Sequence, residues 1–443
     1  MAADSVLILG AGSSGEACAS TLRELEPQTP ITIVERELVG GECSYFACMP
    51  SKALLRPVEA LHAARLVPGA AEAVTGPPAP EGVFWHRDQV VSNLDDSSQE
   101  EWLKSKEIEL VRGVAVVMSP GVVAVGGREL RYGRLVVATG SVPSIPPIPG
   151  IDAVDVWTNR QATTAHEIPG SLVVLGAGPV GCELAQFYAR MGSNVSIVDQ
   201  ADRLLPRDDP AAGDLIAEVF ANDGIRLHLG IGVQRVEKGI VVHLESGEEV
   251  RGDRLLVATG RSANTDGLNL EQLGVQIGKR GVEVDDSMRA AENVWAIGDV
   301  NGIAMFTHAG KYQARIAAAD MAGRPAKADH RAVPAVTFTD PQVASVGRFS
   351  GDGLVSGERR IDQLSRTSTY ERPTRRGFLK VIADPKRNVL VGAVAVGPEA
   401  GEWLGQLTLA IRAEVPIDVL EDTIQPYPTF SEAVQFAVRD LPL

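Results

Sequence analysis

Two copies of one glycine pattern constrain the fold of this chain more than any other feature. The first copy is Val6-Leu7-Ile8-Leu9-Gly10-Ala11-Gly12-Ser13-Ser14-Gly15, and the second is Leu172-Val173-Val174-Leu175-Gly176-Ala177-Gly178-Pro179-Val180-Gly181. Each is an apolar run of strand length that breaks into glycines and continues as a helical pattern. The first glycine permits a tight turn, the second admits a pyrophosphate, and the third lets the helix pack on the strand. Two such units predict two bound dinucleotides.

An acidic residue ends the next strand of each unit. Glu35 follows the apolar run 31–34, and Asp199 follows the run 195–198. A carboxylate at this place accepts hydrogen bonds from a ribose diol. At the second site it would favour the free 2′-hydroxyl of NADH over the 2′-phosphate of NADPH, while Arg203 nearby would soften that preference. We therefore expect NADH as the preferred donor and NADPH as the alternative.

A pair of cysteines follows the first glycine unit, in the segment Gly40-Gly41-Glu42-Cys43-Ser44-Tyr45-Phe46-Ala47-Cys48-Met49-Pro50-Ser51-Lys52. A dithiol so close to a dinucleotide can exchange electrons with it, and the cofactor that faces both a hydride donor and a disulfide is a flavin. FAD is therefore expected in the first unit and the nicotinamide in the second. Thiolate is the reactive form, and Lys52 and a helix N-terminus after Cys43 would supply the positive potential it needs. The alternative is a buried, reduced pair with no redox role.

The rest of the chain divides around these two units. Residues 67–82 are rich in Pro, Gly and Ala and predict an exposed excursion. Strands are expected at 135–140 and 255–261, and a strand that ends at Gly298-Asp299 leads into a helix over 308–321. In the last third, 335–338, 377–383 and 389–396 have the pattern of antiparallel strands, with a helix over 403–413.

These segments predict an α/β protein with two Rossmann-like domains and a C-terminal α+β domain. The expected ranges are 1–150 with 262–331 for the FAD domain, 151–261 for the NAD(P) domain and 332–443 for the last domain.

The composition agrees with a cytoplasmic enzyme. A net charge of −15 argues against nucleic acid and anionic membranes as partners. No apolar stretch reaches the length of a membrane span, and the N-terminus has no secretory signal pattern. Four cysteines do not make a disulfide scaffold, and Cys18 and Cys182 have the positions of small buried thiols. A reducing compartment suits a pair that must cycle, and no metal site is expected.

With these motifs in place, the chain resembles the flavoprotein pyridine nucleotide-disulfide oxidoreductases, the family of dihydrolipoamide dehydrogenase, glutathione reductase and mercuric reductase. The resemblance covers essentially the full length. It implies a homodimer formed through the C-terminal domain, in which 338–341 match the first strand and turn.

The resemblance also implies roles for individual residues. Cys48 would be the thiol nearer the flavin, Cys43 the outward thiol that attacks substrate, and Lys52 with Glu183 an ion pair near flavin N5. The FAD site would comprise Gly10, Gly12, Ser14, Gly15, Glu35, Gly41, Cys43, Lys52, Thr139, Gly140, Gly298 and Asp299. The nicotinamide site would comprise Gly176, Gly178, Val180, Gly181, Asp199 and Gly260.

One departure from the family pattern bears on the substrate. Where disulfide-reducing members carry a histidine held by a glutamate, this chain has Tyr427 and retains Glu432. A phenol, with an ordinary pKa of about 10, is a poor base at neutral pH, and losing such a base typically costs on the order of a hundred- to ten-thousandfold in rate. Tyr427 is therefore either a functional phenol or a packing aromatic. Mercuric reductases share the tyrosine, but they end in a cysteine pair that this chain lacks after Cys182.

Three functions follow. The first is an FAD-containing enzyme that passes electrons from NADH through Cys43 and Cys48 to an unusual disulfide or thiol substrate. The second is a reductase of metal ions or quinones, favoured by Tyr427 and by Tyr45 and Phe46 between the cysteines. The third is an NADH-responsive flavoprotein that signals its redox state without turnover. In the first two, the acceptor is a small molecule.

Overall fold

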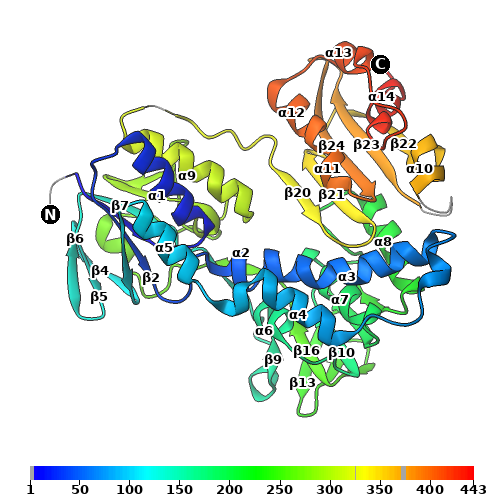
Figure 1. Cartoon of the computed structure of the whole chain (residues 1–443), viewed down its shortest axis with the longest axis horizontal. Helices are drawn as coiled ribbons and strands as arrows, with labels where there is room; N and C mark the ends of the chain where they lie inside the picture. Colours follow the sequence, from blue (N-terminus) through cyan, green and yellow to red (C-terminus); the bar gives the residue numbers. More distant parts are fainter. Residues whose placement is uncertain (1–3, 325, 371–375) are drawn as a thin grey trace. The chain divides into compact units, whose positions relative to one another are not determined.

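The computed structural model describes residues 4–324, 326–370 and 376–443 (Figure 1). Parts of the three expected domain ranges, namely 1–3, 325 and 371–375, lie outside the described residues. The chain forms two compact units, each built from three stretches of sequence. Unit 1 comprises Met1–Pro50, Arg87–Ser144 and Arg261–Asp329, and unit 2 comprises Ser51–His86, Ile145–Gly260 and His330–Leu443.

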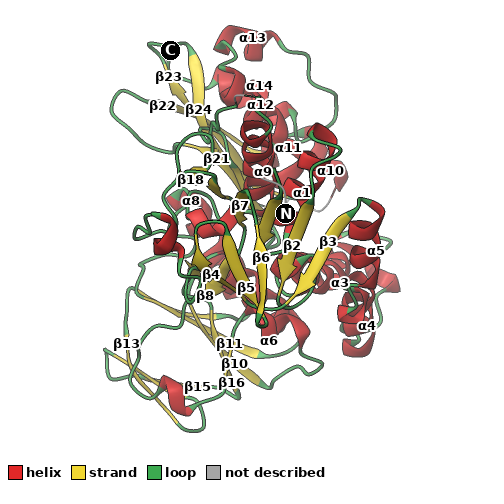
Figure 2. Ribbon diagram, turned by 90° about the vertical axis from the view of Figure 1, so that its left-hand side faces the viewer, coloured by secondary structure: helices red, strands yellow, loops and turns green. Residues whose placement is uncertain are grey.

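Unit 1 is built on a six-stranded sheet in the order β18-β19-β7-β1-β2-β3. Strands β19, β7, β1, β2 and β3 run parallel, and β18 is antiparallel to β19. The bounds are β1 Val6–Leu9, β2 Ile31–Glu35, β3 Ile108–Arg112, β7 Arg134–Val137, β18 Arg289–Ala291 and β19 Val294–Ala296. Figure 2 shows β2 and β3 side by side.

The two faces of this sheet are covered differently, because strand side chains alternate. Val6 and Ile8 pack towards helices α1 (Ser13–Leu25) and α9 (Thr307–Met321), which lie side by side in Figure 1. Leu7 and Leu9 pack towards a three-stranded antiparallel sheet. That sheet has β4 Ala115–Ser119, β5 Val122–Val125 and β6 Arg128–Arg131, and the unit also holds α2 Gly41–Tyr45, α5 Ser97–Ser105, β8 Ser141–Pro143 and β17 Arg261–Ala263.

Unit 2 repeats the parallel arrangement in a five-stranded sheet, β12-β11-β10-β16-β9. Its strands are β9 Val156–Trp157, β10 Ser171–Leu175, β11 Asn194–Asp199, β12 Arg226–Leu229 and β16 Arg254–Val257. Its other elements are α6 Asn159–Thr164, α7 Pro179–Arg190, α8 Pro210–Asn222 and the antiparallel strands β13 Val233–Glu237, β14 Val241–Leu244 and β15 Glu249–Arg251. Helices α3 (Cys48–Leu66) and α4 (Pro80–Val90) connect unit 1 to unit 2 along the chain.

The C-terminal part of unit 2 is an antiparallel sheet, β20-β21-β24-β23-β22, with helices packed on it. The strands are β20 Pro334–Thr337, β21 Gln342–Gly347, β22 Val355–Arg360, β23 Phe378–Asp384 and β24 Val389–Gly397. The helices are α10 Ser365–Tyr370, α11 Ala400–Trp403, α12 Gly405–Ala413, α13 Ile417–Asp422 and α14 Glu432–Arg439 (Figure 2).

The predicted fold class is therefore confirmed: two parallel-sheet regions and one α+β region. The exact domain boundaries stay a prediction. Within the described residues, no helix is both long enough and apolar enough to cross a membrane.

Candidate functional site

The first glycine unit forms a tight turn between β1 and α1. Gly10 has a φ of 103°, and a Cβ there would lie 2.4 Å from the Ala138 carbonyl oxygen. A Cβ on Gly15 would lie 2.0 Å from the Gly10 oxygen, so the helix approaches the strand too closely for any other residue. A Cβ on Gly12 would meet nothing within 4 Å, and α1 begins there without a side-chain cap. This open, uncapped helix N-terminus fits the pyrophosphate of a dinucleotide.

The second unit has the same construction. Gly176 has a φ of 114°, a Cβ on Gly181 would lie 2.0 Å from the Gly176 oxygen, and Gly178 is open. Helix α7 begins at Pro179 without a side-chain cap. Val180, in its first turn, is 39 % exposed.

The two strand-end carboxylates are held in matching ways. Glu35 accepts hydrogen bonds from the backbone N–H groups of Ala11 and Glu37, both at 2.8 Å. Asp199 accepts from Ala177 at 2.6 Å and Ala201 at 2.7 Å. Each carboxylate is thus oriented by its own glycine turn and keeps lone pairs for a ribose diol.

The dithiol segment lies directly on the first glycine turn. The Gly40 N–H donates to the Ala11 oxygen at 2.8 Å, and Gly40 forms a β-bridge with Gly12. Gly41 has a φ of 62°, and a Cβ there would lie 2.9 Å from the Gly12 Cα. The segment then forms the short helix α2 around Cys43, and α3 begins at Cys48.

The two thiols are in hydrogen-bonding contact. That contact raises the pKa of Cys43, and burial raises it further, while the Thr307 hydroxyl and the Lys311 ammonium act in the opposite direction. The Thr307 Oγ1 lies 3.5 Å from the Cys48 Sγ. Because α9 begins at Thr307, its N-terminus adds positive potential at the sulfur. The neighbourhood therefore stabilises one thiolate more readily than two.

The other residues expected at the FAD site gather at the ends of β7 and β19. Thr139 Oγ1 donates to the Asn264 oxygen at 2.7 Å, and Gly140 and Gly298 have positive φ. A Cβ on Gly298 would lie 2.6 Å from the Ser14 Oγ. A side chain at position 298 would therefore collide with Ser14.

Asp299 is half-buried and belongs to a chain of polar contacts that was not predicted from the sequence. Burial raises its pKa, and Ser141 Oγ donates to its carboxylate at 2.6 Å. Arg261 Nε donates to Ser141 Oγ at 2.7 Å, and its guanidinium lies 3.7 Å from the carboxylate of Glu42, next to Cys43. Ser141 and Arg261 each follow an Ala-Thr-Gly sequence, a repeated signal that would have found them.

Lys52 and Glu183 form an ion pair in unit 2. The Lys52 Nζ lies 2.8 Å from Glu183 Oε2, and Glu183 is buried. The other oxygen of Glu183 accepts a hydrogen bond from the Phe338 N–H at 2.9 Å. The predicted partners are thus brought together, whereas Phe338 was predicted only as part of a strand. Gly260, also predicted, ends the β16 segment with a φ of 146°.

Tyr427 lies before α14, and Glu432 is the first residue of that helix. Tyr427 is 73 % exposed, and Glu432 Oε2 accepts from the Thr429 N–H at 3.3 Å. The Glu432 carboxylate thus contacts the backbone of the segment that leads into α14. Tyr427 presents its phenol to solvent on the C-terminal domain.

Family models match both parts of the chain. The pyridine nucleotide-disulphide oxidoreductase model matches residues 4–322, and the dimerisation domain of the same group matches residues 333–438. The mercuric reductase of Acidithiobacillus ferrooxidans is 34 % identical over 98 % of this chain and 82 % of its own length. Dihydrolipoyl dehydrogenase 2 of Haloarcula marismortui is 33 % identical over 98 % of this chain and 95 % of its own.

Solved structures agree. The HOCl-induced flavoprotein disulfide reductase RclA of Escherichia coli, solved as a Cu(II) complex, matches with a TM-score of 0.85 and 26 % identity over 98 % of this chain and 99 % of its own. The resemblance predicted from the motifs is thus confirmed, as is the prediction of an enzyme. The chain belongs to the pyridine nucleotide-disulphide oxidoreductases, an FAD-dependent family that uses pyridine nucleotides.

Proposed function

We propose that this protein transfers two electrons from NADH through FAD to the Cys43–Cys48 disulfide and on to a small-molecule acceptor. The observation that carries the proposal is the seating of the dithiol segment on the first glycine turn, through Gly40 and Gly41. A redox pair anchored there would share its site with the dinucleotide that the turn holds.

The residues present fit both dinucleotides. Gly10, Gly12, Gly15 and Glu35 would hold the adenylate and pyrophosphate of FAD, and the half-buried Asp299 would accept a hydrogen bond from a hydroxyl of its ribityl chain. Bound FAD would supply the two-electron carrier between hydride donor and disulfide. The chain's own thiols would do the rest. The two electrons and the proton of the hydride convert the disulfide into one thiol and one thiolate, and the Thr307 hydroxyl would donate to the thiolate of Cys48.

The second glycine unit supports NADH as the donor. Asp199 is fixed by two backbone N–H groups and faces its own glycine turn as a carboxylate. A 2′-phosphate placed beside it would meet like charge. Arg203, whose guanidinium lies 3.6 Å from Asp202, would offset part of that repulsion.

The acceptor is proposed to be one that needs no strong base: an unusual disulfide whose thiol leaves readily. Tyr427 and Glu432 support this. An exposed phenol stands where disulfide-reducing members carry the histidine, and the retained Glu432 carboxylate accepts a hydrogen bond from the Thr429 N–H. In a homodimer formed through the C-terminal domain, Tyr427 would come from the partner subunit. A cytoplasmic location would keep the dithiol in a reducing compartment.

A second candidate is a soft metal ion. Relatives over nearly the whole chain are mercuric reductases, and RclA was solved with Cu(II). Two adjacent thiolates are the ligands that soft ions prefer. Reduction of Cu(II) would take one electron per ion, so the dithiol would serve two ions for each NADH.

An anaerobic titration tests the proposal. NADH added to the FAD-loaded protein should produce the long-wavelength absorption of a thiolate against oxidised flavin, and Cys48→Ser should remove that band. Cys18→Ala, at a buried thiol of unit 1, is the matched control and should keep it. Absence of the band in the unmodified protein would refute the dithiol route.

Acceptor assays then separate the candidates. Cys43→Ser should abolish reduction of disulfides and metal ions, while quinone reduction at the flavin should persist. Turnover with 5,5′-dithiobis(2-nitrobenzoate) but not Cu(II) or Hg(II) would favour the disulfide, and the reverse would favour the metal ion. Flavin bleaching by NADH without turnover of any acceptor would contradict both.

A further inference from the structure

Phe338 touches both members of the Lys52–Glu183 ion pair. Its backbone N–H donates to Glu183 Oε1 at 2.9 Å, and its ring lies under the Lys52 ammonium, with Nζ 4.5 Å from the ring centroid. Glu183 Oε2 meets the same ammonium at 2.8 Å. Phe338 therefore orients Glu183 through its backbone N–H and Lys52 through its ring.

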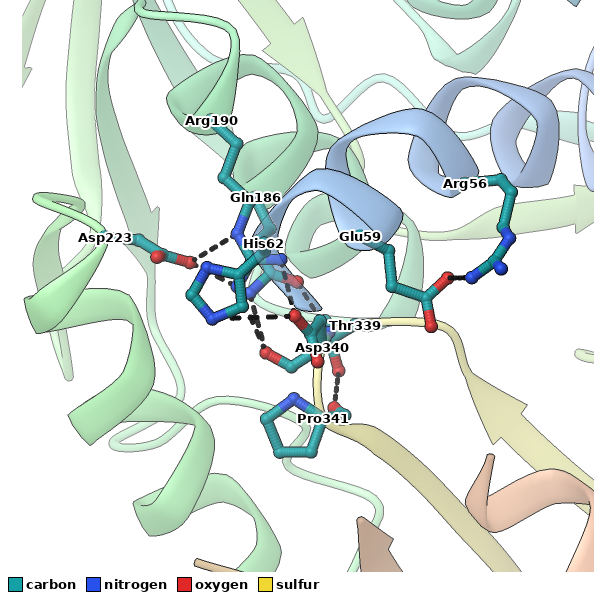
Figure 3. A network of polar contacts seen from close by, with 9 residues as sticks. All are labelled: Arg56, Glu59, His62, Gln186, Arg190, Asp223, Thr339, Asp340 and Pro341. Atoms are coloured by element: carbon teal, nitrogen blue, oxygen red, sulfur yellow. Dashed lines mark hydrogen bonds and ion pairs between the residues drawn. The ribbon is translucent and has the colours of Figure 1, made fainter. Parts of the chain in front are cut away.

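The segment that carries Phe338 is fixed by the next turns of α7. Gln186, one turn after Glu183, donates to the Asp340 carbonyl at 3.0 Å and accepts from the Asp340 N–H at 2.7 Å. Arg190, one turn further, lies 2.7 Å from the Asp340 carboxylate. These contacts are drawn in Figure 3, where side chains from α7 converge on Asp340. Residues 183, 186 and 190 lie on one face of α7, and this face contacts the segment 338–340 over two turns of the helix.

Helix α3 reaches the same segment at a second point. His62 on α3 lies 3.9 Å from the Asp340 carboxylate (Figure 3). Lys52 and His62, ten residues apart along α3, thus both lie against the segment 338–340. The position of Lys52 is determined from both sides, by Glu183 and by the ring of Phe338.

We propose that Phe338 is a positioning residue that fixes the Lys52 ammonium for electron transfer. The Lys52 side chain is 34 % exposed and carries its ammonium on a flexible stem. Without the ring, Glu183 and a longer contact to Ser51 Oγ, at 3.3 Å, would leave the ammonium several positions. The ring covers one side of the ammonium and removes that freedom. This inference rests on the proposed function and on the predicted role of Lys52 as a source of positive potential for the thiolate.

The test compares substitutions that keep the Phe338 backbone N–H. Phe338→Leu removes the aromatic face and Phe338→Tyr retains it, while Phe378→Leu makes the same change in the buried β23 as a control. Flavin reduction by NADH is followed by anaerobic stopped flow, and the pH midpoint of the thiolate band is followed by titration. We expect Phe338→Leu to slow flavin reduction roughly 2- to 30-fold and raise the band midpoint, with Phe338→Tyr close to the unmodified protein.

A double-mutant comparison separates positioning from packing. If Phe338 acts through Lys52, Phe338→Leu should change the rate no further in a Lys52→Met background. Phe378→Leu should lower thermal stability without moving the band midpoint. Equal effects of Phe338→Leu and Phe378→Leu on both readouts, or full additivity with Lys52→Met, would overturn the inference. Absence of any NADH-driven band in the unmodified protein would instead refute the proposed function.

Discussion

Replacing Arg190 with methionine should strongly destabilise unit 2. Arg190 Nη1 lies 2.7 Å from the Asp340 carboxylate, and Nε lies 3.1 Å from that of Asp223. The three side chains are only 10 %, 7 % and 13 % exposed, and burial lowers the pKa of Arg190. Methionine would keep the stem's packing but leave two carboxylates without their cation. Breaking such a buried pair costs about 3–5 kcal/mol, because the remaining charge stays desolvated.

Urea unfolding followed by circular dichroism measures this loss, at equal slopes of free energy against denaturant. Arg56→Met is the matched control, because the Arg56–Glu59 pair is 66 % and 35 % exposed and should contribute at most about 1 kcal/mol. Adding Asp340→Asn to Arg190→Met should recover part of the loss. An Arg190→Met variant as stable as Arg56→Met would refute this account.

Three further outcomes are expected. Burial raises the pKa of Glu16 to about 7 from its ordinary 4.5; nearby Glu35 also raises this pKa, and Lys311 lowers it. The folded state therefore favours the protonated form of Glu16. As the pH rises from about 4.5 to 7, the flavin-free protein should lose on the order of 3 kcal/mol of unfolding free energy. Thermal melts of a Glu16→Gln variant should show no such loss, and an unchanged dependence of stability on pH would exclude Glu16 as its source. Asp199→Asn should lower the ratio of kcat/KM for NADH to kcat/KM for NADPH roughly tenfold or more. An equal fall in kcat/KM with both donors would contradict the proposed role of Asp199. Tyr427→His should raise lipoamide reduction on the order of a hundredfold in steady-state assays, unless the phenol only packs.

Sequence patterns located most elements because their signals are local. Continuous apolar runs and glycine spacing predicted β1, β2 and β10 with the helices that follow the two glycine turns. Strand β20 is instructive, since the pattern predicted 335–338 but the strand ends at Thr337. The Phe338 N–H leaves the ladder and donates to Glu183, 155 residues away. A strand pattern contains no information about such a partner.

The missed site residues share this property. Thr307 meets Cys48 across 259 residues, and Ser141 meets Asp299 across 158. Serine and threonine fit many environments, so their types alone do not mark a site. Only the packing of α1 on α9, where Gly310 and Ser14 come close, brings Thr307 to the dithiol. Thr307 and Ser141 could not be predicted from the sequence, because their contacts to Cys48 and Asp299 depend on tertiary packing.

The electrostatics of the dithiol bear on which acceptor it serves. The neighbouring Cys48 and burial raise the pKa of Cys43, so a second thiolate is unfavourable while the first remains charged. An ordinary disulfide substrate therefore needs a base to activate Cys43, and Tyr427 is ill suited to that task. A soft cation needs no such base. Its positive charge between the two sulfurs offsets the repulsion between two thiolates, and its binding releases the proton of Cys43. Within the proposed function, the pair as it lies beside Thr307 is thus better matched to a metal ion, or to a disulfide whose thiol leaves without protonation, than to a dialkyl disulfide.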